Sequence, residues 1–166
     1  QFVRDARIAM IYEGANGVQA LDLVGRKLMK DGGRAWMTWF AEVDLFLADN
    51  AGVADLKPFL DGLSSAKADL GEGIQWMGAN AMANFDNAGA GSMDLLNLFA
   101  LTAIAEGWAR MAKVAVDRQQ TADPYYARKL ITGRYFLARI LPDAKAHLAK
   151  LRTGAEPVMA LPAEAF

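Results

Sequence analysis

The chain has 166 residues, 54% of them hydrophobic and 22% charged, so we expect a packed globular chain of single-domain size and not a disordered one. The 18 Lys and Arg residues balance 19 Asp and Glu residues, and this formal charge of −1 gives no electrostatic argument for binding nucleic acid or an anionic membrane. The absence of cysteine excludes disulfides and thiolate metal sites, and the single His147 makes a histidine-based metal site or catalytic triad implausible.

The first predicted elements are two helices that meet at a sharp corner. Apolar residues at helical spacing predict one helix over 3–10 and a second over 18–30. Asn16 is suited to N-cap the second helix, with Gln19 in the position of a capping-box partner. The carboxylate of Glu13 therefore stands at a helix-to-helix corner and not on a solvated helix face.

Turn residues divide the remainder into further helices. Asp31-Gly32-Gly33 ends the second helix, and apolar stripes then predict helices over 34–50, 55–85, 92–120, 124–141 and 143–152. The run Asp86 to Gly91 is predicted to be a loop, after which Ser92 caps a helix. Two prolines mark boundaries, because Asp123-Pro124 is a cap followed by proline and Pro142 must break the helical pattern.

The helix expected over 55–85 begins at a capping Asp55 and carries four glycines (Gly62, Gly71, Gly73 and Gly78), which indicate close packing against neighbouring helices. The helix over 92–120 is apolar on two faces and is expected in the middle of a bundle. Glu106, Arg110 and Lys113 interrupt its apolar run, so we predict no membrane span. The tail over 154–166 is expected to be irregular, with four apolar side chains available to contact the bundle: Val158, Met159, Leu161 and Phe166.

These patterns predict an all-α fold. The expected architecture is an antiparallel helical bundle of about five long helices with a four-helix up-and-down core, preceded by the helix-turn-helix corner. The four tryptophans are expected as core or interface residues, and His147 as a solvated helical residue. Four cations of the region 128–139 are interpreted as a solvated helix face, with a coenzyme A phosphate as the alternative ligand: Arg128, Lys129, Arg134 and Arg139.

The corner also resembles a known family. The motif consists of Arg4-Asp5-Ala6-Arg7-Ile8, then Ile11-Tyr12-Glu13-Gly14, then Asn16 and Gln19. It is similar to the carboxy-terminal signature of flavin-dependent acyl-CoA dehydrogenases, with Ala15 where that family usually has threonine. The stretch from about residue 33 onward resembles, more weakly, the extra helical domain of long bacterial members. We therefore expect residues 1–32 to end the catalytic helical domain and residues 33–166 to form an appended bundle.

The resemblance implies a role for each corner residue. Glu13 matches the base that abstracts the α-proton of an acyl-CoA thioester, and its backbone N–H matches a donor to the thioester carbonyl. Gly14 matches a substrate contact, and Ala15, Asn16 and Gly17 match a stretch that contacts the FAD cofactor. A carboxylate held beside the substrate is chemically suited to this proton transfer.

The expected function is that of the C-terminal fragment of an FAD-dependent acyl-CoA dehydrogenase, which oxidises acyl-CoA to trans-2-enoyl-CoA. We expect the intact parent to be a cytoplasmic homo-oligomer that passes electrons to electron-transfer flavoprotein. The chain begins within a helical pattern, so we interpret it as a fragment of a longer protein. The fragment alone is expected to be inactive and to bind FAD weakly or not at all, because it lacks the sheet domain and most of the helices that would enclose the flavin. The alternative is a non-catalytic helical module for oligomerisation or interaction. The acyl chain stays open and includes straight, branched and sulfur-bearing groups such as 3-methylthiopropanoyl.

Overall fold

The computed structural model describes residues 1–11, 15–121 and 123–165, and all the regular structure in these ranges is helical. The predicted all-α fold is confirmed. The α-helices are α1 (Phe2–Ala6), α2 (Ile8–Ile11), α3 (Asn16–Asp22), α4 (Arg34–Asn50), α5 (Lys57–Ala81), α6 (Asp86–Asp117), α7 (Pro124–Arg139), α8 (Asp143–Arg152) and α9 (Glu156–Met159). Short π and 3₁₀ elements are η1 (Leu23–Lys27), η2 (Lys30–Gly33), η3 (Ala54–Leu56) and η4 (Ala163–Ala165).

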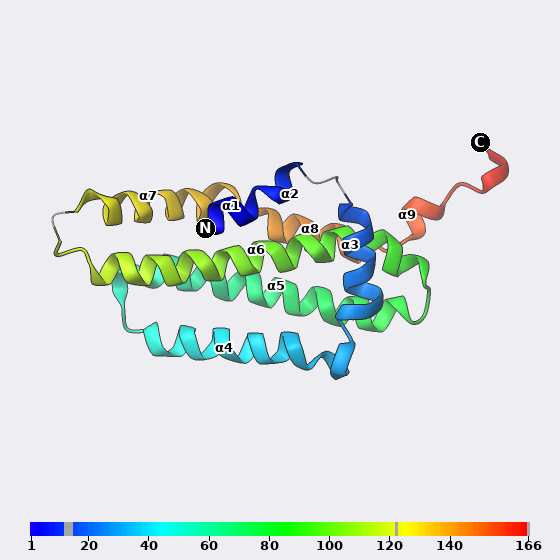
Figure 1. The fold of residues 1–166 in the computed structure, drawn as a ribbon. Coiled ribbons are helices and arrows are strands. Elements are labelled where there is room, and N and C mark those ends of the chain that lie inside the picture. Colours follow the sequence, from blue (N-terminus) through cyan, green and yellow to red (C-terminus); the bar gives the residue numbers. More distant parts are fainter. Residues whose placement is uncertain (12–14, 122, 166) are drawn as a thin grey trace.

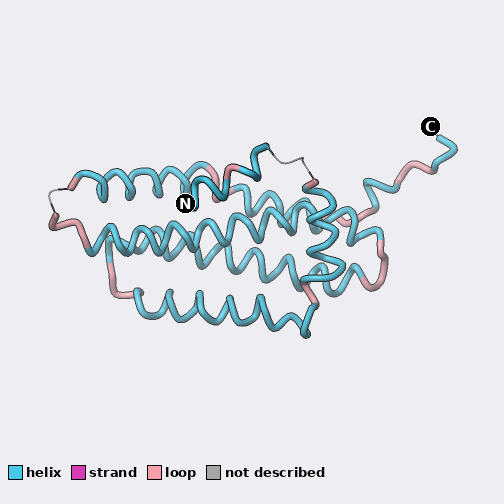
Figure 2. The backbone as a smooth tube through the Cα atoms, viewed as in Figure 1, coloured by secondary structure: helices cyan, strands magenta, loops and turns pink. Residues whose placement is uncertain are grey.

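Four helical columns run antiparallel and form three layers. The α5–α6 hairpin is the middle layer, α4 lies along one side of it, and α7 followed by α8 lies along the other (Figure 1). Consecutive columns reverse direction, and the connections between them are short (Figure 2). This is the up-and-down topology predicted from the sequence. The helix α3 crosses one end of the hairpin and contacts α6.

The core follows the length of the hairpin in two clusters. One joins α5 and α6 to α4 and α7 through residues such as Val43, Phe59 and Phe136, and the other joins them to α8 through residues such as Leu70 and Leu148. The buried positions of α6 are mostly small, including a run of alanines over 105–115. Small side chains allow α6 to contact several helices at short range, so it occupies the centre of the bundle as predicted.

Three helix boundaries lie where local chemistry requires them. Gly32 and Gly33 adopt positive φ angles of 66° and 80°, which end the preceding segment before α4 begins. The side chain of Asp123 accepts a hydrogen bond from the backbone N–H of Tyr125 at 2.9 Å, which caps α7. Pro142 lies between α7 and α8, where it interrupts the fourth column. All three boundaries were predicted from the sequence.

The segment predicted as a loop over 86–91 is helical, and this prediction is wrong. The connection instead occupies residues 82–85, and α6 begins at Asp86, whose backbone N–H donates to Asn84 Oδ1 at 3.0 Å. The small residues are explained by packing, because a Cβ on Gly91 would approach Met77 Cε at 3.0 Å and Leu151 Cγ at 3.4 Å. Ser92 is consequently an interior residue of α6 and does not cap it.

Two further local expectations are corrected. Asp55 does not cap α5, because it lies within η3 and Leu56 occupies the cap position without a side-chain hydrogen bond. His147 is not solvated, since its side chain is 19% exposed and its Nδ1 lies 2.7 Å from Asp94 Oδ1, which joins α8 to α6. Pro58 does lie in the first turn of α5, as predicted.

The tail leaves the bundle instead of packing against it. Gly154 turns the chain with a φ of 67°, and α9 then extends away from the four columns (Figure 1). Val158, Met159 and Leu161, which were available to contact the bundle, are mostly exposed, and Phe166 lies outside the described residues. The tail is also not wholly irregular, because it contains α9 and η4. A Cβ on Gly154 would approach Asn87 Oδ1 at 2.9 Å, so the turn depends on glycine at this position.

Within the described residues, α6 is the single helix long and apolar enough to pass a length-and-composition test for crossing a membrane. Its most apolar 18-residue window has a mean hydropathy of 1.3. The central position of α6, in contact with α3, α5, α7 and α8, accounts for this apolarity, as expected of a helix in the middle of a bundle.

Candidate functional site

The predicted catalytic corner connects α2 to α3. Glu13 and Gly14 lie outside the described residues, between the end of α2 at Ile11 and the N-cap of α3 at Ala15. The carbonyl of Ala15 accepts a hydrogen bond from the N–H of Gln19 at 3.0 Å, so the second helix of the corner begins here. The predicted helix-to-helix arrangement on either side of Glu13 is present in the fold.

The capping prediction at this corner is wrong. Ala15, not Asn16, is the N-cap residue of α3, and no side-chain hydrogen bond caps the helix among the described residues. Asn16 is the first helical residue, and its side chain is exposed. Gly17 is exposed too, and a Cβ placed on it would meet no described atom within 4 Å. Asn16 and Gly17 are thus open to another molecule.

The helices around the corner present apolar side chains that the bundle does not cover. Phe2 is 91% exposed, and Val3, Ile8, Val18 and Leu21 are each more than half exposed. Ala20 is the buried residue of α3, with 0% of its surface exposed. A site enclosed by apolar surface therefore needs atoms beyond those that the described part of this chain supplies.

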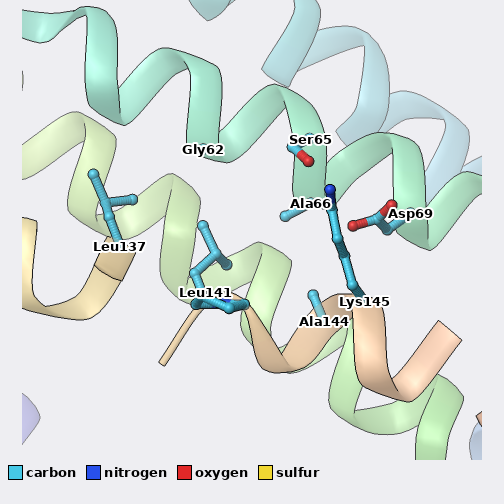
Figure 3. A pocket seen from close by; sticks show the side chains of 9 residues that line it. Gly62, Ser65, Ala66, Asp69, Leu137, Leu141, Ala144 and Lys145 are labelled. Carbon is cyan, nitrogen blue, oxygen red and sulfur yellow. The ribbon is translucent and has the colours of Figure 1, made fainter. Parts of the chain in front are cut away.

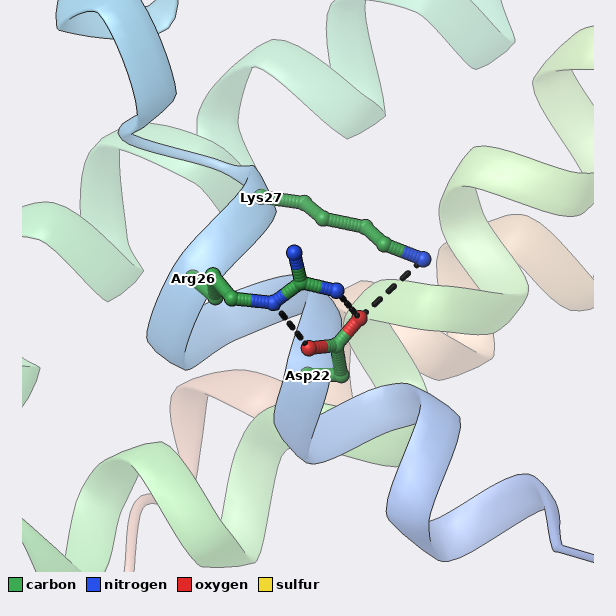
Figure 4. A network of polar contacts seen from close by, with 3 residues as sticks. All are labelled: Asp22, Arg26 and Lys27. Carbon is green, nitrogen blue, oxygen red and sulfur yellow. Dashed lines mark hydrogen bonds and ion pairs between the residues drawn. The ribbon is translucent and has the colours of Figure 1, made fainter.

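An ion cluster stabilises the turn that follows α3 (Figure 4). The carboxylate of Asp22 accepts hydrogen bonds from Arg26 Nε at 2.6 Å and Nη2 at 2.9 Å, and it lies 3.1 Å from Lys27 Nζ. These bonds from Arg26, followed by that from Lys27, lower the pKa of Asp22 to about 2. The π-helical η1, marked by the Leu28 N–H to Leu23 carbonyl bond of 2.8 Å, brings Lys27 to the same side as Asp22. The single carboxylate is paired with two exposed cations, so we interpret the cluster as structural.

A cavity of about 270 Å³ opens at the break between α7 and α8, where both face α5 (Figure 3). Its apolar wall is formed by Gly62, Ala66, Leu137, Leu141, Pro142 and Ala144, and its polar edge by Ser65, Asp69 and Lys145. Burial raises the pKa of Asp69, and the positive charge of Lys145 opposes that rise. The break at Pro142 was readable from the sequence, but the meeting of α5 with α8 at this point was not.

The cavity at Pro142 holds one carboxylate and no set of groups suited to catalysis. Among the described residues, no group of three or more His, Asp or Glu side chains is placed to hold a metal ion. His147 and Asp94 form a separate pair between α8 and α6. The chemistry-bearing group singled out by the sequence is therefore still Glu13 at the corner.

The bundle matches a known sequence family. The profile of the family described as "Acetyl-CoA dehydrogenase C-terminal like" matches residues 39–162. The chain belongs to this family. The matched range begins within α4 and ends after α9, so it covers all four columns of the bundle.

Three curated relatives are acyl-CoA dehydrogenases. The chain is 32% identical to the 3-methylmercaptopropionyl-CoA dehydrogenase of Ruegeria pomeroyi, over 91% of this chain and 26% of the relative. It is 27% identical to a broad-specificity linear acyl-CoA dehydrogenase of Mycobacterium tuberculosis, over 100% of this chain and 29% of the relative. It is 23% identical to the butyryl-CoA dehydrogenase of Syntrophomonas wolfei, over 100% and 28% respectively.

The predicted resemblance to the carboxy-terminal part of an acyl-CoA dehydrogenase is confirmed by this membership. The chain spans between a quarter and three tenths of the length of these relatives. The family profile covers the bundle and begins after the corner, so the roles of Glu13 to Gly17 stay predictions. The division into residues 1–32 and 33–166 likewise stays a prediction.

Proposed function

We propose that this chain is the carboxy-terminal part of an FAD-dependent acyl-CoA dehydrogenase and contributes its catalytic base. The observation that carries this proposal is the family match across the bundle, with three acyl-CoA dehydrogenases as relatives. The corner motif before the bundle supports it, because it contains an acid at a helix-to-helix connection. The reaction is the oxidation of an acyl-CoA thioester to the trans-2-enoyl-CoA.

In the proposed mechanism the carboxylate of Glu13 removes the α-proton of the thioester and holds it on a carboxyl oxygen. The backbone N–H of Glu13 donates to the thioester carbonyl oxygen, which gains negative charge as the α-proton leaves. Gly14 contacts the substrate without a side chain that would obstruct it. When bound, the flavin supplies the two-electron acceptor chemistry of the oxidation.

The described corner residues fit a nucleotide cofactor on steric grounds. Asn16 and Gly17 are exposed at the start of α3, and no described atom would lie within 4 Å of a Cβ on Gly17. Together with the small Ala15, they leave space for a cofactor to approach the backbone. We assign Ala15, Asn16 and Gly17 as the residues that would contact FAD.

The bundle in this proposal is an appended domain over residues 33–166. The parent protein would be a cytoplasmic homo-oligomer, with electron-transfer flavoprotein as its electron acceptor. The relatives are named for different acyl groups, namely 3-methylmercaptopropionyl, broad-range linear and butyryl thioesters. We therefore propose the substrate at the level of an acyl-CoA thioester. The chain over residues 1–166 is expected to be inactive and free of flavin.

The visible spectrum of the full-length protein, purified without added cofactor, tests this function. We expect a bound flavin whose absorbance is bleached by at least one member of a panel of acyl-CoA thioesters. A flavin that no thioester reduces would contradict the proposed reaction. Protein without flavin would favour a helical interaction module, which is the second candidate because α1–α3 expose apolar side chains.

The substitution Glu13→Gln tests the base in the full-length protein. Glutamine preserves the size of the side chain but cannot accept the α-proton as a carboxylate does, so turnover is expected to fall by several orders of magnitude while flavin stays bound. Glu156→Gln, in the exposed α9, is the matched control and should leave turnover unchanged. Near-normal turnover of Glu13→Gln would remove Glu13 from the mechanism.

A further inference from the structure

The cavity at Pro142 exists because the fourth column of the bundle is not a continuous helix. Pro142 has no N–H to donate, so the regular bonding of α7 cannot continue through it. Around it the N–H of Leu141 donates to the carbonyl of Phe136 at 2.9 Å, and the N–H of Asp143 donates to that of Ile140 at 3.1 Å. The helix α8 therefore begins anew, and a space of about 270 Å³ is left where this junction faces α5 (Figure 3).

The wall of this cavity is aliphatic and its volume is small. Leu137 and Leu141 line it from the junction, Gly62 and Ala66 from α5, and Ala144 from α8. An engineered apolar cavity of about 150 Å³ holds benzene, and pockets for drug-sized ligands measure about 300–1,000 Å³. A space of about 270 Å³ therefore suits a small molecule with a short aliphatic body.

Two opposite charges lie at the edge of the cavity without forming an ion pair. Asp69 comes from α5, and Figure 3 shows the side chain of Lys145 extending from α8 towards the side of α5 that carries Asp69 and Ser65. Among the described residues no ion pair joins Asp69 to Lys145. The same two helices do form an ion pair elsewhere, between Glu72 and Arg152. The helices thus allow such pairs, yet they hold Asp69 and Lys145 apart at the cavity.

Each of these two charges is available to a ligand of the opposite sign. Burial raises the pKa of Asp69, because the carboxylate loses water and gains no ion pair, and the charge of Lys145 only opposes this rise. A cation placed directly against Asp69 would stabilise its charged form. For an anion the partner is the Lys145 ammonium and not the start of α8, because the N–H groups of Ala144 and Lys145 already donate to Leu141 and Pro142 at 3.0 and 3.2 Å.

We propose that the cavity at Pro142 binds a free α-amino acid with an aliphatic side chain, such as leucine. The ammonium group of the ligand bonds to Asp69, its carboxylate bonds to Lys145, and its side chain lies against the aliphatic wall. A zwitterion gives each charge of the site its own partner, whereas a simple amine or carboxylate of the same size satisfies only one of them. This inference concerns the bundle and does not depend on the chemistry proposed for Glu13.

Chemical-shift mapping of the isotope-labelled 166-residue chain tests the class of ligand. Leucine should cause saturable shifts at Ser65, Asp69 and Lys145, with a Kd on the order of 1 mM, as expected for a small molecule in an open site. Isoamylamine lacks the carboxylate of leucine and isocaproate lacks its amine, so each should bind about tenfold more weakly or worse. Glycine, which has both charges and no side chain, should bind more weakly as well. Absence of saturable shifts with leucine, or equal binding of any of these analogues, would overturn the proposal.

Substitutions of the two charges test the assignment of the ligand contacts. Asp69→Asn and Lys145→Gln should each weaken leucine binding about tenfold or more. Neither side chain forms an ion pair within the described fold, so both variants should retain the helical circular dichroism of the parent. Lys150→Gln, at an exposed position of the same helix, is the matched control and should leave the Kd unchanged. Leucine binding that survives both substitutions would overturn the proposal.

The full-length protein tests whether the cavity is accessible in the parent, since this chain spans between a quarter and three tenths of the length of its relatives. In saturation-transfer NMR, the methyl signals of leucine should respond to the full-length protein and lose this response with its Lys145→Gln variant. Leucine binding to the 166-residue chain alone would mean that another part of the parent covers the cavity, and it would overturn the proposed site. Bleaching of the flavin by acyl-CoA is measured separately, so failure of one proposal is distinguishable from failure of the other.

Discussion

Gly133 provides a sharp test of the packing between the hairpin and α7. A Cβ at this position would lie 2.6 Å from Phe59 Cε1 and 3.0 Å from both Phe59 Cζ and Trp108 Cε3. Phe59 is 1% exposed, so its ring has no free space into which it can move. The substitution Gly133→Ala therefore forces two aromatic rings apart, although alanine is the better helix former.

The expected size of the effect comes from two opposing terms. Replacing a helical glycine with alanine stabilises the helix by about 0.8–1 kcal/mol. Overpacking a dense core costs about 1–3 kcal/mol. The net change for Gly133→Ala is thus about 0–2 kcal/mol of destabilisation, whereas glycine sites without contacts should show the gain alone.

Gly78 is the matched control, because it is a helical glycine in the last turn of α5 and a Cβ there would meet no described atom within 4 Å. Urea unfolding followed by circular dichroism should place the two variants about 1–3 kcal/mol apart, since both share the helix-propensity gain. In a chain of this size, each kcal/mol corresponds to roughly 2–4 °C in Tm. Equal stability of Gly133→Ala and Gly78→Ala would refute the close contact with Phe59 and Trp108.

Other predictions concern pH and the closure of the bundle end. Because burial raises the pKa of Asp69, the folded chain loses stability as pH rises through that pKa. The variant Asp69→Asn should therefore be at least as stable as the parent in urea at pH 7. It should lose this advantage at pH 3.5, where the Asp69 carboxyl of the parent is protonated. The pKa of Asp22 is shifted in the opposite direction, to about 2, so its contribution to stability is present above about pH 4 and is lost as pH falls towards 2. In thermal scans, the Tm of an Asp22→Asn variant should therefore fall less steeply with decreasing pH than the Tm of the parent. Asn87→Ala removes the acceptor of the Ala155 N–H at 2.8 Å and should destabilise the folded chain by about 1–3 kcal/mol. The control Asn97→Ala loses only a hydrogen bond within α6 and should change stability little. Equal effects of the two substitutions would contradict a role for Asn87 in closing the end of the bundle.

The sequence alone determined the fold class and most helix boundaries. Gly33 with its positive φ, the capping Asp123 and the break at Pro142 act through the backbone of their own neighbourhood. Such signals do not depend on the remainder of the fold, so they can be recognised from the sequence alone. The family resemblance rested likewise on a short contiguous motif around Glu13.

The candidate site could be predicted only as far as this motif reaches. The sequence located the corner between two helices, but the described part of the chain leaves Asn16 and Gly17 exposed and most apolar side chains of α1–α3 uncovered. A local motif contains no information about the positions of the surfaces that would enclose a substrate and a flavin. Glu13 therefore stays a prediction that the Glu13→Gln variant can test.

Tertiary structure decided the features for which local signals were absent or misleading. The run from Asp86 to Gly91 has the composition of a loop, yet it is helical because Gly91 packs closely against Met77 and Leu151 from two other helices. His147 meets Asp94 only because α8 lies along α6, and Lys145 reaches the edge of the cavity beside Asp69 only because α8 lies along α5 as well. Each of these outcomes depends on contacts between residues far apart in the chain. Local preferences of about 1 kcal/mol per residue are overridden when burial and close packing contribute more.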